Sequence, residues 1–221
     1  QKKLLGGPPA KGEDPSAAAQ RVARSLARTM YRRPPSDNEV DVLVRVFSLA
    51  RESGKSYPEA LRLMVKATLV SPQFLYITPS PTSNSGRTAV SQELPLLDDH
   101  QIASRLSYLL WSTMPDAELS ALADSGKLQN TEVIAAQARR MLKDPRSRSL
   151  FDGFGAQWLG LDKLEGKAFD AKKFPQMTPK LRTAMYDEAR YLFQDILQNN
   201  QKLITFIESD FTYLNGTLAP I

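Results

Sequence analysis

The stretch Asp98–Leu119, DDHQIASRLSYLLWSTMPDAEL, holds the only histidine of the sequence and a helix stop followed at once by a helix start. Its apolar side chains recur every three to four residues, which predicts one buried helical face formed by Ile102, Leu106, Leu109 and Leu110. Asp98 and Asp99 stand where carboxylates cap a first helical turn. Pro115 cannot continue that helix but suits the first turn of a second one, which carries acids at Asp116 and Glu118. The stretch is therefore predicted to be a helix, a tight corner and a second helix.

Four side chains are the candidate binding residues of the chain: Arg105, Trp111, Asp116 and Trp158. Arg105 lies between apolar neighbours, so we expect its guanidinium to meet a carboxylate from elsewhere in the fold, because an unpaired buried charge is costly. Trp111 and Trp158 each fall in an apolar helical stripe, which favours core packing over a platform on which sugars stack.

Helical periodicity continues on both sides of this stretch and predicts an all-α fold. Residues 1–14 are predicted to be a linker, and residues 15–77 a small three-helix bundle. Residues 78–95, rich in Ser, Thr and Pro, are predicted to be a linker or mobile loop. Residues 96–221 are predicted to form a larger helical bundle, cut short at its C-terminal end. One of its helices is expected to bury a single stripe formed by Leu150, Phe151, Phe154, Trp158 and Leu159.

Composition excludes several classes of site. The chain has no cysteine, which excludes disulfides, thiolate metal sites and covalent haem attachment within it. Its apolar runs are far shorter than the roughly 20 residues of a membrane helix, so no transmembrane segment is expected, and residues 1–12 show no signal peptide. The net charge of +5 comes from the basic residues of the N-terminal part. We interpret that excess as a solvated helix surface rather than a nucleic-acid site.

Motifs of catalysis are missing from the sequence. His100 is alone, so no histidine metal cluster or Ser–His–Asp triad can form, and it is interpreted as an ordinary surface or capping histidine. No catalytic residue and no metal ligand is assigned. Three pairs of acids are interpreted as caps or ion-pair partners rather than a glycosidase pair: Asp98/Asp99, Asp187/Glu188 and Glu208/Asp210. Gly153, Gly155 and Gly160 depart from dinucleotide-loop spacing and are expected to permit close helix contact.

Five motifs in a fixed order carry a family resemblance. They are YRRP at residues 31–34 with Glu39, LVSPQFL at 69–75, SRLSYLLWS at 104–112 with MPD at 114–116, QWLGL at 157–161 and DFTYLN at 210–215. In this order they resemble the paired helical domains of unknown function in large exported proteins of planctomycetes and related bacteria. The resemblance implies a periplasmic or cell-surface location and a c-type cytochrome segment on the same polypeptide. Haem c would therefore sit on another domain, with no cofactor in this chain.

Two functions from different classes follow. The leading hypothesis is a helical scaffold or interaction region of a larger exported, haem-bearing protein, whose partners are other domains of the same polypeptide, another protein or a polysaccharide. The alternative is part of a redox or polysaccharide-acting enzyme with a cleft between the two helical units, and whether the chain is an enzyme is left open. Nucleic-acid binding by the basic N-terminal bundle is the least favoured interpretation.

Overall fold

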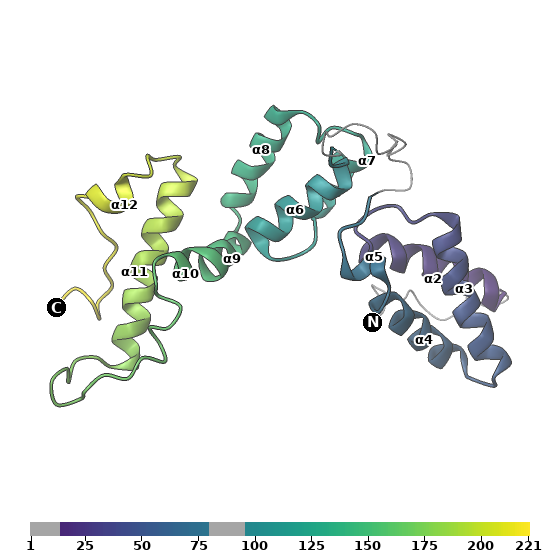
Figure 1. The fold of residues 1–221 in the computed structure, drawn as a ribbon, viewed down its shortest axis with the longest axis horizontal. Helices are drawn as coiled ribbons and strands as arrows, with labels where there is room; N and C mark the ends of the chain where they lie inside the picture. Colours follow the sequence, from purple (N-terminus) through teal and green to yellow (C-terminus); the bar gives the residue numbers. More distant parts are fainter. Residues whose placement is uncertain (1–13, 80–95) are drawn as a thin grey trace, which may run out of the picture. The chain divides into compact units, whose positions relative to one another are not determined.

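The computed structural model describes residues 14–79 and 96–221, and every regular element in these ranges is a helix (Figure 1). The all-α prediction is therefore confirmed. The longer helices are α2 (Pro15–Met30), α3 (Asp37–Glu52), α4 (Tyr57–Leu69), α6 (Asp99–Trp111), α7 (Ala117–Asp124), α8 (Thr131–Leu142) and α11 (Pro179–Gln198). The short helical turns are α5 (Pro72–Leu75), η1 (Pro145–Ser147), α9 (Arg148–Leu150), η2 (Phe151–Gly155), α10 (Ala156–Trp158) and α12 (Thr205–Glu208). None of these helices is long and apolar enough to cross a membrane.

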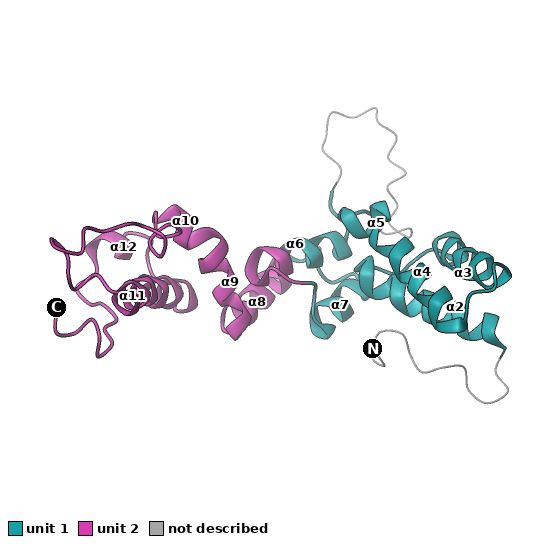
Figure 2. Cartoon of the chain, turned by 90° about the horizontal axis from the view of Figure 1, so that it is seen from below, with its two compact units in different colours: residues 1–105, 114–130 teal, residues 106–113, 131–221 magenta. Residues whose placement is uncertain are grey.

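The two predicted linkers fall almost wholly outside the described residues, apart from positions 14, 78 and 79. The described residues divide into two compact units, drawn in different colours in Figure 2. One unit contains the described residues of the range 1–105 together with 114–130, and the other contains residues 106–113 and 131–221, so α6 contributes to both. The division of the chain at residues 78–95 stays a prediction.

Helices α2, α3 and α4 form the predicted N-terminal bundle. Side-chain caps begin two of them: Asp14 accepts from the Ser16 amide, and Ser36 forms a reciprocal capping box with Glu39. The apolar faces meet in one cluster of buried side chains that includes Val22, Leu26, Val40, Leu43, Phe47, Leu61 and Met64. Burial of these large side chains is the main source of the bundle's stability.

A left-handed residue, Arg32, follows the C-cap of α2. Arg32 has φ of 58° and donates from Nη2 to the carbonyl oxygens of Gln73, Phe74 and Tyr76 at the end of α5. Its neighbour Arg33 is buried and forms a two-bond ion pair with Glu39, at 3.0 and 2.7 Å. The two arginines of the YRRP segment therefore hold α5 and the start of α3 against the end of α2, so both have a structural role.

The corner of residues 98–119 folds as two helices, as predicted, but its details are shifted. Asp98 caps α6, because its Oδ1 accepts from the Gln101 amide at 2.8 Å and its own amide donates to Gln101 Oε1. Asp116 is the N-cap of α7 and accepts from the Leu119 amide at 2.9 Å. Pro115 therefore precedes the cap instead of opening the first turn, so the predicted start of this helix is about two residues too early.

The buried face of α6 also differs from the prediction. Its most buried side chains are small ones together with the end of the helix: Ala103, Ser104, Ser107, Leu110 and Trp111. Leu109, predicted to be buried, is 62% exposed, and Ile102 and Leu106 are only half-buried. The apolar pattern predicts a face about one position away from the observed one. The difference arises because tertiary packing buries the side of the helix that carries small residues.

The second unit has a smaller aromatic core. Phe151, Ala156 and Phe193 are buried together, and the Phe151 ring meets the Phe193 ring edge-on at 5.4 Å. Residues 148–158 run as one helical rod that contains a π-helical turn, η2. Gly155 lies in this turn against Phe193, and a Cβ placed there would be 3.0 Å from that ring. The expected close helix contact is therefore present at Gly155.

Candidate functional site

Trp111 is a core residue. It is 3% exposed, and its indole N–H donates to the Met141 carbonyl at 2.9 Å. The Arg146 guanidinium lies 3.5 Å from the centre of its ring, within the range of a cation–π contact. Asp144 holds Arg146 in place by two hydrogen bonds, which lower the pKa of Asp144 to about 2. The ring is thus fully engaged by the protein, as core packing predicts.

Arg105 and Asp116 occupy other settings. Arg105 is exposed, so the expectation of a buried charge that demands a carboxylate partner is wrong. Its position on α6 follows from the shifted buried face of that helix. Asp116 serves as the cap of α7. Neither residue needs a ligand to explain its place in the fold.

Trp158 contradicts the core prediction. It is 56% exposed, and Phe154, one turn earlier, is 54% exposed. The rings of these two residues are parallel within 9° at 6.2 Å, and Trp158 meets the Phe206 ring edge-on at 5.3 Å. We call Phe154, Trp158 and Phe206 the Trp158 cluster. It is the candidate functional site, because large apolar rings are seldom left this exposed together.

The π-helical turn η2 explains why the cluster faces outward. A π turn hydrogen-bonds one residue further along than an α turn, so side chains rotate progressively away from the α-helical pattern through it, by about 100° at its end. Phe151, at the start of η2, is fully buried, whereas Phe154 and Trp158 are exposed. The predicted single stripe is therefore wrong beyond Phe151. Such turns frequently occur at functional sites.

The cluster has a rigid base and an apolar margin. Phe206 packs against the buried core of Phe151 and Phe193, which fixes the ring that supports Trp158. Three more apolar side chains of the segment around α12 are exposed: Leu203, Ile204 and Ile207. Sequence reasoning missed this segment as a site because it has no regular periodicity.

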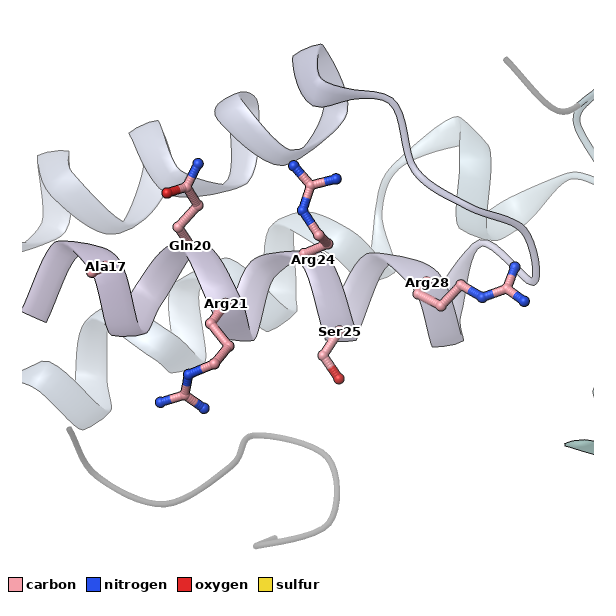
Figure 3. A pocket seen from close by; sticks show the side chains of 6 residues that line it. All are labelled: Ala17, Gln20, Arg21, Arg24, Ser25 and Arg28. Atoms are coloured by element: carbon pink, nitrogen blue, oxygen red, sulfur yellow. The ribbon is translucent and has the colours of Figure 1, made fainter. Parts of the chain in front are cut away.

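A shallow depression of about 560 Å³ runs along the exposed side of α2. Figure 3 shows Arg21 and Ser25 pointing to one side of the helix and Gln20 and Arg24 to the other, so its polar groups do not converge on one point. Arg24 is paired with Asp37 at 2.7 Å and Arg28 with Asp124 at 2.7 Å. This surface is consequently less basic than its sequence suggests.

His100 is buried, so the prediction of an ordinary surface or capping histidine is wrong. It is 9% exposed, and its Nε2 lies 3.6 Å from Asp124 Oδ1. Burial lowers the pKa of His100 and the nearby Arg28 charge lowers it further, against the opposing effect of Asp124, Asp98 and Asp99. Its position at the start of α6 gave no signal of the residues that would surround it.

Most of the paired acids have structural partners. Asp98 caps α6, and Asp99 accepts from the Leu128 amide at 2.6 Å. Asp187 pairs with Arg190 at 2.9 Å, and Glu188 accepts from the Thr212 hydroxyl. The interpretation is thus confirmed for Asp98, a cap, and for Asp187, an ion-pair partner, whereas Asp99 and Glu188 accept hydrogen bonds that are neither. Within the ranges 14–79 and 96–221, no group of three or more His, Cys, Asp or Glu side chains is arranged to hold a metal ion.

These observations define an all-helical protein with a buried tryptophan at its corner and an exposed aromatic cluster beside a π turn. Comparison with known families places it: residues 97–221 match the model of PSD4, a protein of unknown function (DUF1592), so the chain belongs to the PSD4 family. Residues 18–78 match PSD5, also a protein of unknown function (DUF1595). The expected pair of domains of unknown function is therefore confirmed. No curated protein and no solved structure matches the sequence.

Proposed function

We propose that this chain is a helical interaction region of a larger exported, haem-bearing protein, and that the Trp158 cluster is where it contacts another domain of the same polypeptide. The observation that carries the proposal is the exposure of Phe154 and Trp158 on a support of buried aromatic rings. The resemblance carried by the five ordered motifs supports the wider setting, and the two successive family matches support the pairing of the two domains. In that setting the protein acts in the periplasm or at the cell surface.

The cluster has the chemistry of a protein contact. Interface centres are enriched in Trp and Phe, and a few such anchors provide most of the binding energy. Ile204 and Ile207 extend the apolar area beyond the rings, which suits a protein surface better than a sugar chain. The rigid support under Trp158 limits the entropy lost when a partner packs on it. Haem c would be attached to another domain, because this chain has no cysteine.

The test uses the fluorescence of the two tryptophans. Trp111 is buried, so the difference between wild type and the Trp158→Phe variant isolates the signal of Trp158. In the 221-residue chain we expect acrylamide to quench this signal strongly. In the full-length protein we expect protection and a blue shift of emission. Equal quenching of Trp158 in both proteins would overturn the proposal.

The enzyme alternative stays a prediction without a specific observation in its favour. Asp116 and Asp98 are helix caps, and Arg105 is exposed on α6. Each of these positions is explained by the fold.

A further inference from the structure

Arg28, Asp124 and His100 form a small cluster that links helices distant in sequence, and we call it the clasp. Arg28, near the end of α2, donates from Nη2 to both oxygens of Asp124 at 2.8 and 2.7 Å. Asp124 is the last residue of α7. The clasp therefore ties the N-terminal bundle to the corner formed by α6 and α7 inside one compact unit.

His100 lies against this ion pair without completing it. Its Nε2 is 3.6 Å from Asp124 Oδ1, longer than a hydrogen bond. Both oxygens of Asp124 are already engaged by Arg28. The Nη1 atom of Arg28 is buried and has no hydrogen-bond partner among the described residues, so the pair is not fully satisfied. A neutral imidazole is compatible with this arrangement.

A protonated His100 is not compatible with the closed clasp. The imidazolium would place a buried cation beside the partly exposed Arg28, with one carboxylate, Asp124, between them. The other acids that face His100 are Asp98 and Asp99, at the start of its own helix. Asp98 is occupied in capping Gln101, and Asp99 accepts from Leu128 and Gln129. The added charge is therefore poorly compensated while the clasp is closed.

We propose that the clasp is a pH-sensitive joint: protonation of His100 releases Arg28 from Asp124 and frees α2 from α7. The free energy follows from linkage. Because the closed clasp holds the pKa of His100 below its ordinary value, the closed form binds the proton less tightly than the open form. Closure is favoured at neutral pH and is lost as pH falls through the interval between the two pKa values. The ratio of open to closed forms rises about tenfold for each pH unit that separates the His100 pKa of the open form from that of the closed form.

The test is a distance measurement across the joint in the 221-residue chain. Because the chain has no cysteine, the variants Ser25→Cys on α2 and Ala121→Cys on α7 place spin labels at two exposed sites only. We expect the label–label distance to lengthen and broaden between about pH 7.5 and about pH 5. The same labels in the His100→Gln background are expected to show no pH response, and Asp124→Asn is expected to be open throughout.

A second measurement keeps the test decisive if His100→Gln fails to fold. His100 is the only histidine, so its ring protons give one NMR titration curve. Arg28→Gln removes a repelling charge and opens the joint, and both effects should raise the pKa of His100 toward its ordinary value. The proposal is wrong if His100 titrates while the distance stays constant, or if Arg28→Gln leaves its titration unchanged.

Discussion

The N-terminal bundle and the segment from η2 to α12 both contain helices with apolar stripes, but the bundle buries its stripes and the segment leaves part of its stripe exposed. In the bundle, large apolar side chains such as Leu26 and Phe47 enter one shared core. In the second region a small core forms around Phe151 and Phe193, and the large apolar rings of Phe154 and Trp158 stay exposed. An apolar stripe therefore indicates a helix reliably, but it does not say whether the helix buries that stripe in its own unit.

The placement of the tryptophans makes this contrast measurable. Trp111 and Trp158 both belong to the second compact unit, and the sequence contains no other tryptophan. Tryptophan fluorescence therefore reports unfolding of that unit, whereas far-UV circular dichroism reports the helices of both. Comparing the two signals assigns a loss of stability to one unit.

The largest expected effect separates two phenylalanines of the same turn. Phe151→Ala should lower the free energy of unfolding of the second unit by about 3–5 kcal/mol, because it empties a fully buried position. Phe154→Ala, three residues later, should change it by less than about 0.5 kcal/mol because its ring is exposed. Urea unfolding followed by tryptophan fluorescence measures both. Similar losses for the two variants would contradict the assignment of Phe154 to a surface cluster.

The next effect tests the buried ion pair of Arg33 and Glu39 in the N-terminal bundle. Arg33→Ala should lower the free energy of unfolding by about 3 kcal/mol, because it leaves the largely buried Glu39 carboxylate without its ion-pair partner. Arg24→Ala is the matched control, since it breaks the exposed pair with Asp37 and should cost less than about 1 kcal/mol. Circular dichroism should show both changes, while tryptophan fluorescence should change little. Equal costs for the two arginines would show that burial does not distinguish them.

The same pair predicts a pH dependence. Burial raises the pKa of Glu39, but hydrogen bonds from Arg33 and Ser36 outweigh it and hold the pKa below the ordinary value. A carboxyl with a lowered pKa stabilises the fold above its unfolded pKa, and that contribution is lost as pH falls through the folded one. Wild-type bundle stability should thus fall in acid below about pH 4.5 more steeply than that of Glu39→Gln. Parallel pH profiles of unfolding free energy for wild type and Glu39→Gln would contradict this role of Glu39.

Much of the fold could be predicted from the sequence because its helix signals are local. The capping box of Ser36 and Glu39 and the apolar repeat of the first three helices act within a few residues, and the bundle follows from them. The burial of Trp111 was predicted in the same way. Local rules succeed wherever the partner of a stripe is the next helix along the chain.

The candidate site could not be predicted, since it depends on a change of helical register. Nothing in the residue types of the FDGFG segment announces a π turn, and an α-helical pattern places Phe154 and Trp158 inward. His100 was misjudged for a related reason. Its neighbours Arg28 and Asp124 lie far from it in sequence or across a corner, where periodicity carries no information.

Alanine substitutions at two nearby glycines of the π turn should change the free energy of unfolding by smaller amounts and in opposite directions. Gly155→Ala should cost about 1–3 kcal/mol, because the new Cβ would lie 2.7 Å from the Phe151 ring and 3.0 Å from the Phe193 ring. Gly153→Ala meets nothing within 4 Å and should stabilise the helix by up to about 1 kcal/mol. Fluorescence-detected unfolding resolves the two. A destabilising Gly153→Ala together with a neutral Gly155→Ala would contradict the packing of Gly155 against the two rings.

The smallest expected effect concerns the corner and asks whether Asp116 is more than a cap. Asp116→Ala should lower the free energy of unfolding by about 1 kcal/mol, because the Leu119 amide loses its acceptor. Asp116→Asn should be nearly neutral, since asparagine caps about as well as aspartate. For a chain of this size the loss corresponds to a melting temperature lower by about 2–4 °C, readable by circular dichroism. If Asp116→Asn cost as much as Asp116→Ala, the negative charge itself would be required, and the corner would need a cationic partner that capping does not supply.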